Sequence, residues 1–236
     1  MQHHARPGAI FFDLADTLGY LWVAKHQRFL FLVETAGLAV PSQEVGMAGT
    51  LAFLRTLAQE EPGPADGSLG WRGSLASYGA GLKAMGFNSS AALARDLGEV
   101  ARHLPFTIVP DPAAGRLLGH LKASGFRLGV ISNHRGTLKE NLAELGLLDH
   151  LDVALDSHLI GCRKPDPEIF RMACRAVDVQ PDEAVHVGDE PASDVIGARN
   201  AGLFSVLIDP LSIFKYTCYA DARIESLAQL EEVLPL

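Results

Sequence analysis

The chain has 236 residues, of which 48% are hydrophobic, and a formal net charge of -8. That length is enough for one sizeable core with a modest insertion, and the hydrophobic fraction is typical of globular rather than disordered proteins. The acidic balance gives no general attraction to nucleic acid or to an anionic membrane, so we expect neither as a partner.

The lack of a recognisable targeting signal and the pattern of cysteines both favour a cytoplasmic protein. No apolar stretch approaches the length of a membrane span, and the segment from Met1 to Pro7 lacks the apolar core of a signal peptide. The three cysteines are odd in number and show no paired spacing: Cys162, Cys174 and Cys218. We expect them to be reduced thiols.

The first predicted element is a short buried strand, Ala9-Ile10-Phe11-Phe12, which delivers Asp13 at its carboxyl end. Residues 19–105 then form a long insertion whose apolar residues repeat at helical spacing. A Gly/Pro-rich break at 61–67 divides this insertion into two helical pairs. Since the insertion contains no run of β-branched residues, we expect a small helical domain.

From Phe106 onward, predicted helices and strands alternate. We expect strands at 127–131, 153–155, 184–187 and 205–208, with an edge strand at 223–224. We expect helices at 117–123, 138–145, 167–177 and 195–201, and a last one reaching residue 230. Strands separated by helices imply right-handed crossovers and a parallel sheet. The predicted fold is therefore an α/β doubly wound parallel sheet made by residues 1–18 and 106–236, with residues 19–105 as an inserted helical domain.

Polar side chains follow four of the apolar runs. They are Asp13, the pair Ser132-Asn133, Lys164 before Pro165, and Asp189 with Asp194. Ligands of open α/β sheets collect at the carboxyl ends of the strands. A nucleophile, a hydroxyl, an ammonium and an acidic pair together suit a phosphoryl group and a divalent cation. Taken alone, each residue is better explained as part of a turn, a solvated loop or a helix cap, so it is the combination and its order that support the site.

These residues resemble the four motifs of the haloacid dehalogenase superfamily of hydrolases, and they occur in the family's order. The first motif, Asp-x-Asp-Gly-Thr, stands here as Asp13-Leu14-Ala15-Asp16-Thr17. The others stand as a strand ending in Ser132-Asn133, as Lys164-Pro165-Asp166-Pro167, and as Gly188-Asp189 followed by Asp194. The resemblance covers nearly the whole chain and implies a Rossmann-like core with a helical cap inserted after the first motif.

The resemblance also implies a role for each motif residue. Asp13 is expected to attack phosphorus and form an aspartyl-phosphate. Ser132, Asn133 and Lys164 are expected to bind the phosphate, and Lys164 to hold Asp13 ionised. Magnesium is the expected cofactor. Its expected ligands are Asp13, the carbonyl of Ala15 and Asp189, with Asp194 as an outer ligand or an orienting group.

Ala15 departs from the family pattern, because the phosphatases carry there an Asp that protonates the leaving oxygen and then activates water. Loss of such a general acid-base is worth about 10²–10⁴ in rate. Asp16 or a cap residue is one candidate replacement; the alternative is that Asp16 only caps the turn. The chain is then a phosphatase with a non-standard acid-base, a carbon–phosphorus hydrolase that uses a cap lysine, or a non-catalytic phosphate- or partner-binding member. Dehalogenases usually carry a bulky aromatic residue at that position and need no metal, so Ala15 and Asp189 argue against that activity.

We expect the inserted domain to close over the site and to set specificity for a small phosphorylated substrate. The candidate contacts are Trp22, Lys25, Arg28, Trp71, Arg72 and Lys83. Only Lys25 and Lys83 could form a Schiff base from within the insertion. We expect a monomer or a homodimer.

Overall fold

The computed structural model describes residues 7–57, 73–88, 90–104, 107–214 and 219–234. The chain divides into two compact units, one formed by Met1–Tyr20 with Ile108–Leu236 and the other by Leu21–Thr107. The predicted break at 61–67, the candidates Trp71 and Arg72, and Cys218 lie outside the described residues.

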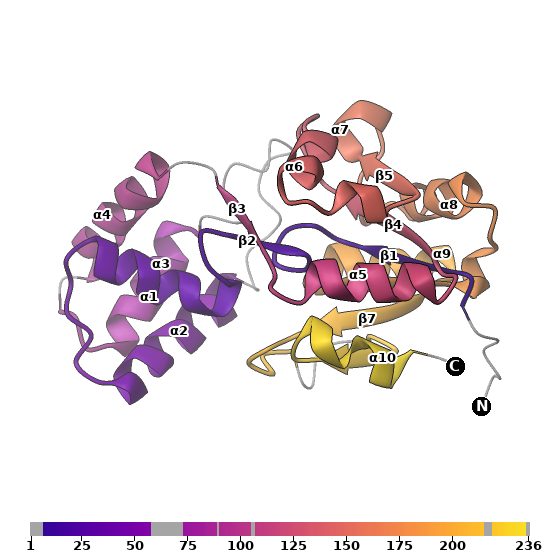
Figure 1. The fold of residues 1–236 in the computed structure, drawn as a ribbon. Coiled ribbons are helices and arrows are strands. Elements are labelled where there is room, and N and C mark those ends of the chain that lie inside the picture. The colour runs from indigo at the N-terminus through magenta and orange to yellow at the C-terminus, as the bar shows by residue number, and fades with distance from the viewer. Residues whose placement is uncertain (1–6, 58–72, 89, 105–106, 215–218, 235–236) are drawn as a thin grey trace. The chain divides into compact units, whose positions relative to one another are not determined.

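The first unit is built on a six-stranded parallel sheet with the strand order β5-β4-β1-β6-β7-β8 (Figure 1). Its strands are β1 (Ala9–Phe12), β4 (Arg127–Ser132), β5 (Val153–Asp156), β6 (Ala184–Gly188), β7 (Phe204–Ile208) and β8 (Ala222–Ile224). All four residues of β1 are buried, as expected for a central parallel strand that is covered on both faces. The predicted α/β class and doubly wound sheet are confirmed.

Two helical layers cover the sheet. The helices α5 (Ala114–Ala123), α6 (Leu138–Glu144) and α10 (Leu230–Val233) pack on one face, and α8 (Pro167–Ala176) and α9 (Gly197–Ala201) on the other. Successive side chains of a strand point to opposite faces. In β1, therefore, Ile10 and Phe12 belong to the first core, and Ala9 and Phe11 belong to the second.

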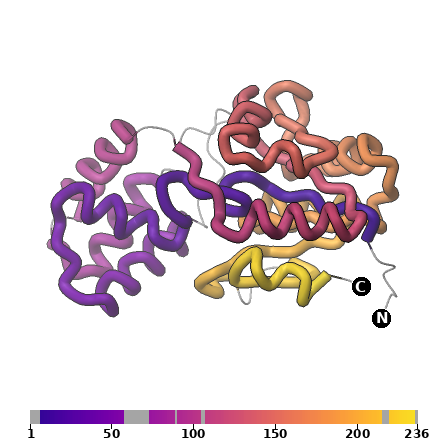
Figure 2. The backbone as a smooth tube through the Cα atoms, viewed as in Figure 1, coloured from indigo at the N-terminus to yellow at the C-terminus, as the bar shows by residue number. Residues whose placement is uncertain are grey.

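Strands are added to the sheet first on one side of β1 and then on the other. The helix α5, which runs alongside β1 (Figure 2), leads to β4 on one side, and α8 later leads to β6 on the other side. Phe12 is aligned with Val130 of β4 and with Val187 of β6. The three strands therefore end within two residues of one another at one edge, at a topological switch point where such sheets bind ligands.

Shorter elements complete the first unit. They are α7 (Ser157–Ile160), the 3-10 helices η1 (Leu148–His150), η2 (Pro181–Glu183) and η4 (Leu227–Gln229), and the π-helix η3 (Pro191–Ile196). The predicted helix at 195–201 is thus divided: residues up to Ile196 belong to η3, and α9 begins at Gly197. The Glu190 carbonyl accepts the N–H groups of Asp194 at 2.8 Å and of Val195 at 3.4 Å at the start of η3. No described helix is long and apolar enough to cross a bilayer.

The second unit contains four helices among its described residues: α1 (Lys25–Thr35), α2 (Gln43–Leu57), α3 (Leu75–Ala84) and α4 (Ser90–His103). Its core holds a stack of aromatic rings. The ring centroid of Phe53 lies 5.2 Å from that of Phe29 and 5.6 Å from that of Tyr78. Gly81 lets α3 approach this stack, because a Cβ there would lie 2.4 Å from the Phe29 ring.

A small sheet at the unit boundary corrects the expectation that residues from 19 onward are helical. Gly19–Leu21 forms β2, which pairs with β3 (Ile108–Pro110) in a separate two-stranded sheet. Gly19 permits this pairing, since a Cβ there would lie 2.8 Å from Ile108 Cγ2 and 3.0 Å from the Val109 carbonyl. The Tyr20 hydroxyl also donates to Asp111, just beyond β3.

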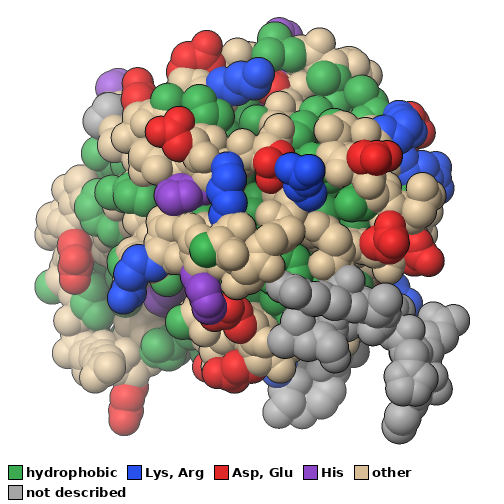
Figure 3. All heavy atoms as spheres, turned by 45° about the vertical axis from the view of Figure 1, so that its right-hand side comes forward, with side chains coloured by type: hydrophobic (Ala, Val, Ile, Leu, Met, Phe, Trp, Pro, Cys, Tyr) green, Lys and Arg blue, Asp and Glu red, His purple; other side chains and the backbone are tan. Residues whose placement is uncertain are grey.

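Acidic and basic side chains lie interspersed on the molecular face in Figure 3. The net charge of -8 is therefore not gathered into one acidic patch on the described part of that face.

The space around two glycines predicts opposite effects of alanine substitution on stability. A Cβ on Gly129 in β4 would lie 2.5 Å from Val153 and 2.9 Å from Phe11, so Gly129→Ala should lower the free energy of unfolding by about 1–3 kcal/mol. Gly119 in the middle of α5 has its nearest neighbour at 3.6 Å, so Gly119→Ala should raise that free energy by about 0.5–1 kcal/mol. Urea denaturation measures both. Equal effects of the two changes would contradict the packing described.

Candidate active site

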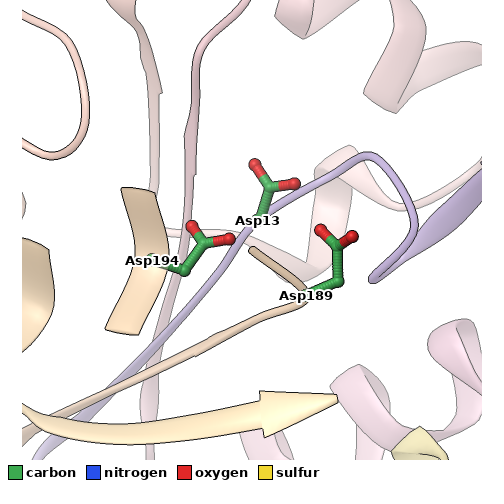
Figure 4. A group of neighbouring side chains, drawn as sticks. All are labelled: Asp13, Asp189 and Asp194. Atoms are coloured by element: carbon green, nitrogen blue, oxygen red, sulfur yellow. The ribbon is translucent and has the colours of Figure 1, made fainter. Parts of the chain in front are cut away.

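Three carboxylates converge at the carboxyl edge of the sheet (Figure 4). Asp13, Asp189 and Asp194 each offer one oxygen, and these oxygens lie within 4.8 Å of one another. Asp13 directly follows β1, and its N–H continues the ladder to the Val187 carbonyl at 2.9 Å. Asp189 follows β6, and Asp194 lies in η3. The strand register therefore brings together three predicted site residues that lie up to 181 positions apart in the sequence.

Lys164 lies between two of these carboxylates. Its side chain is 2% exposed, and its Nζ donates to Asp13 Oδ1 at 2.7 Å and to Asp194 Oδ1 at 2.6 Å. The Asp13 and Asp194 side chains are themselves 10% and 2% exposed. This is a buried ion-pair network, in which each charge depends on its partners because water is excluded.

Asp194 receives the larger share of the hydrogen bonds. Its Oδ1 also contacts His186 Nε2 at 2.9 Å, and its Oδ2 accepts the Glu190 N–H at 3.0 Å. This close approach requires Gly188, because a Cβ at that position would lie 2.3 Å from Asp194 Cγ. Both oxygens of Asp194 are therefore engaged by protein groups.

The network separates the acidities of the two carboxyl groups. Burial raises the pKa of Asp194, but Lys164 and His186 outweigh that effect and hold the pKa below its usual range. Burial raises the pKa of Asp13 to about 6, because the opposing pull of Lys164 is weaker and the Asp194 charge raises the pKa further. Burial lowers the pKa of Lys164, but attraction to both carboxylates outweighs it, so the ammonium stays charged.

The donor set fits magnesium. Carboxylate oxygens are the hard ligands that magnesium prefers, and the metal usually takes only one or two of them beside several waters. Three carboxylates meet here and Lys164 pairs with two of them, so this edge of the sheet carries more negative charge than one ammonium offsets. Asp13 and Asp189 can supply direct ligands, whereas the engaged oxygens of Asp194 suit an outer position. The carbonyl of Ala15 as a ligand stays a prediction.

Two of the predicted phosphate-binding residues, Ser132 and Asn133, lie at the carboxyl end of β4, and Asn133 contacts Lys164. Ser132 ends β4 and is buried. The Asn133 side chain makes two hydrogen bonds to the backbone of Lys164: its Oδ1 accepts the N–H at 2.9 Å, and its Nδ2 donates to the carbonyl at 3.0 Å. Asn133 thus positions the Lys164 backbone, a role that its place in the sequence did not indicate.

Two residues of this site were missed in the sequence. Asp156, at the end of β5 and aligned with Ser132, accepts the N–H groups of Gly136, Leu138 and His158 at 2.8, 3.2 and 3.0 Å. It thereby holds the loop that follows β4. The signal that could have found it is a polar residue at a strand end. His186 was missed because it lies inside a strand, where alternation assigns it to the core.

The loop after Asp13 is a tight turn. The Leu14 carbonyl accepts N–H groups from Leu18 and Gly19, both at 3.0 Å. Ala15 is exposed and pairs with Gly19, and Asp16 has a φ of 57° while its N–H donates to the Gly19 carbonyl at 2.6 Å. The backbone of Asp16 therefore helps to form the turn, and its role in proton transfer stays a prediction.

The described candidates for substrate contact in the insertion occupy different environments within the second unit. Trp22 and Lys25 are half-buried, Arg28 in α1 is fully buried, and Lys83 in the last turn of α3 is exposed.

Sequence comparison identifies relatives of this chain. The family model for haloacid dehalogenase-like hydrolases matches residues 8–202. The chain is 30% identical over 209 residues to a glyceraldehyde 3-phosphate phosphatase of Methanothermobacter thermautotrophicus, which covers 85% of each chain. It is 35% identical over 134 residues to the mouse haloacid dehalogenase-like hydrolase domain-containing protein 3, covering 56% of this chain and 50% of that protein. A glyceraldehyde 3-phosphate phosphatase of Pyrococcus furiosus is 36% identical over 145 residues, and the match covers 58% of this chain and 60% of that protein. The match thus spans half of the mouse protein and less than two thirds of the Pyrococcus one.

Solved structures show the same fold. A phosphatase from Thermococcus onnurineus aligns over 96% of this chain and 97% of its own, with a TM-score of 0.59 and 23% identity. A 2-haloacid dehalogenase from Pseudomonas syringae pv. Tomato DC3000 aligns over 97% of this chain and 98% of its own, with a TM-score of 0.56 and 29% identity.

Removal of the shared ammonium should destabilise the protein in a pH-dependent way. In the absence of metal, Lys164→Met leaves two buried carboxylates without their partner, so the free energy of unfolding should fall by about 3–5 kcal/mol near neutral pH. Losing the ammonium raises the folded-state pKa of Asp13 further, and a raised carboxyl pKa costs stability as pH rises. The deficit should therefore be smaller at about pH 5 than at about pH 7.5.

Urea denaturation in a chelating buffer measures this deficit, and Lys139→Met, at an exposed lysine, is the matched control. A deficit that is equal at both pH values would contradict the proposed charge balance.

Proposed function

The chain belongs to the haloacid dehalogenase-like hydrolase family, and we propose that it is a magnesium-dependent phosphohydrolase acting on a small phosphorylated substrate. The observation that carries this proposal is the buried Lys164 ammonium shared by Asp13 and Asp194, with Asp189 beside them. Relatives that bear the names glyceraldehyde 3-phosphate phosphatase and phosphoserine phosphatase support a phosphate ester as the substrate.

The first step is transfer of the phosphoryl group to Asp13. A carboxylate oxygen of Asp13 forms a bond to phosphorus, the bond between phosphorus and the ester oxygen breaks, and that oxygen leaves with the electron pair. The leaving oxygen then takes up a proton from solvent or from Asp16, the candidate replacement for the missing acid. Water then attacks the aspartyl-phosphate, releases inorganic phosphate and restores the carboxylate. Lys164 favours both steps because it holds Asp13 ionised and offsets negative charge beside it.

Asp13 and Asp189 would hold the magnesium, with Asp194 in the outer shell. When bound, the cation neutralises the phosphoryl oxygens that would otherwise repel the attacking carboxylate. Ser132 would donate a hydrogen bond to a phosphate oxygen, and the Asn133 contacts to Lys164 would keep the ammonium in register with Asp13.

We further propose that the helical unit within Leu21–Thr107 acts as a cap. It is inserted directly after the strand and loop that carry the nucleophile, and closure of such a unit excludes water and adds contacts to the leaving group. Trp22, Lys25, Arg28 and Lys83 remain the described candidates for those contacts. A monomeric or homodimeric cytoplasmic protein that binds neither nucleic acid nor membrane remains our expectation.

Ala15 favours a second candidate function, a non-catalytic member that binds phosphate or a partner. A methyl group cannot move a proton, whereas the charged network is complete without this side chain. A carbon–phosphorus hydrolase, which needs a cap lysine, is the third candidate, with Lys25 and Lys83 as the available residues. Activity toward phosphate esters separates the first candidate from the other two.

Turnover should depend on Asp13. With magnesium present, the protein should hydrolyse an aryl phosphate, and Asp13→Asn should abolish this because the amide cannot form the acyl-phosphate. The amide has nearly the volume of the carboxylate, so the variant should stay folded by circular dichroism. Wild-type protein that shows bound magnesium but turns over neither aryl phosphates nor a panel of phosphorylated metabolites would favour the non-catalytic candidate.

Magnesium affinity should fall as the pH drops through about 6. Because burial raises the pKa of Asp13 to about 6, a proton competes with the cation below that pH. Affinity should then weaken by about tenfold per pH unit. Calorimetric titration across this range measures the effect.

Two variants serve as controls for this titration. Asp189→Asn should weaken binding at every pH and leave the pH dependence in place, whereas Asp13→Asn should remove that dependence. Unchanged affinity in Asp189→Asn would refute its assignment as a ligand.

Restoring a carboxyl group at position 15 should help poor leaving groups most. Ala15→Asp, combined with Asp16→Gly to ease the left-handed φ of 57°, should raise single-turnover hydrolysis of alkyl phosphates by up to about 10²–10⁴. Aryl phosphates need little protonation and should gain less in that step. No gain on alkyl phosphates would mean that Asp16 already acts as the acid-base or that the site does not serve phosphate esters.

A further inference from the structure

His186 is a fully buried imidazole in the middle of a core strand. It lies in β6 between Val185 and Val187, and its ring is packed edge-on against Phe170, with a centroid distance of 4.9 Å and an interplanar angle of 84°. Its side chain is 0% exposed. Its described ring contact, Phe170, is apolar, so that contact would be served equally well by a leucine.

The contacts of His186 assign its tautomer. Nε2 lies 2.9 Å from Asp194 Oδ1, and a carboxylate oxygen can only accept, so Nε2 carries the proton. Nδ1 finds no hydrogen-bond partner among the described residues. A buried acceptor without a partner is costly. Burial of the His186 imidazole therefore costs free energy at Nδ1, and the hydrogen bond from Nε2 to Asp194 is the contact that offsets this cost.

We propose that His186 is a positioning residue: its Nε2–H fixes the Asp194 carboxylate, and this holds the Lys164 ammonium within reach of Asp13. This inference rests on the proposed function for its effect on catalysis. His186 acts through Asp194, which accepts from Lys164, and Lys164 in turn donates to Asp13. Asp194 and Asp13 are neighbours in Figure 4.

The sharing of one ammonium explains how the effect is transmitted. Asp194 Oδ1 accepts from both Lys164 and His186, while Asp13 Oδ1 also accepts from Lys164. Without the histidine donor, Asp194 Oδ1 keeps Lys164 as its one described donor and draws the ammonium away from Asp13. The nucleophile then loses the partner that keeps it ionised, and the outer shell of the metal site loses its orientation.

Three variants separate positioning from packing. His186→Leu removes the donor at similar volume, and His186→Gln places an amide N–H near the position of Nε2. Val185→Ala removes buried volume at the preceding residue of β6, whose side chain enters the core on the opposite face of the sheet. It tests loss of packing without a change in the network.

Catalysis and metal binding provide the first readout. His186→Leu should lower kcat for an aryl phosphate about 10–100-fold and weaken magnesium affinity by a similar factor in calorimetry. His186→Gln should recover most of both losses, and Val185→Ala should change neither by more than about twofold at a similar loss of thermal stability. The inference is wrong if His186→Leu resembles Val185→Ala, or if His186→Gln is as impaired as His186→Leu.

The second readout needs neither turnover nor metal. Long-range ¹H–¹⁵N NMR of the metal-free protein should show the His186 ring protonated at Nε2 and unprotonated at Nδ1 at neutral pH. A proton on Nδ1 with none on Nε2 would overturn the inference. Inactive wild-type protein would count against the proposed function alone, since the tautomer and the magnesium affinities of the variants still decide the role of His186.

Discussion

The site depends on one buried ammonium shared by two carboxylates. Lys164 Nζ lies 2.7 Å from Asp13 and 2.6 Å from Asp194, where little water can compensate an unpaired charge. The pair is unequal, because Asp194 collects further donors and stays acidic while Asp13 is left with a raised pKa. A cation beside Asp13 would favour its ionised form, which is consistent with the magnesium proposed at this edge.

The surrounding fold supports this arrangement through the backbone. Parallel register brings the ends of β1, β4 and β6 to the same edge of the sheet, and Asn133 links the loop after β4 to the backbone of Lys164. Gly188 leaves room for Asp194, and the π-helix η3 presents that carboxylate to the network. The site residues therefore come from several segments, and each segment is fixed by contacts other than those to a substrate.

The loop after β1 begins with Asp13, which belongs to the charged network, but the Ala15 side chain in that loop cannot transfer a proton. Ala15 is exposed beside a tight turn, and Asp16 contributes its backbone to that turn. Phosphoryl transfer to a carboxylate depends chiefly on positioning and charge, so the proposed phosphohydrolase would favour esters with good leaving groups. The same loop is where a binding-only member of the family would first diverge from its catalytic relatives.

The sequence by itself determined the doubly wound sheet and the acidic and basic residues at its edge, because periodicity and strand-end polarity are local properties. Only the tertiary structure decided how those residues share their hydrogen bonds. The roles of Asn133, Asp156 and His186 depend on partners that are distant in the sequence or folded back from the next turn, and no local pattern distinguishes a buried donor from a core residue. The small sheet of β2 and β3 was missed for the same reason. Its pairing requires Gly19 to meet residues that lie nearly 90 positions later in the sequence, and short strands gain their stability from such contacts rather than from intrinsic propensity.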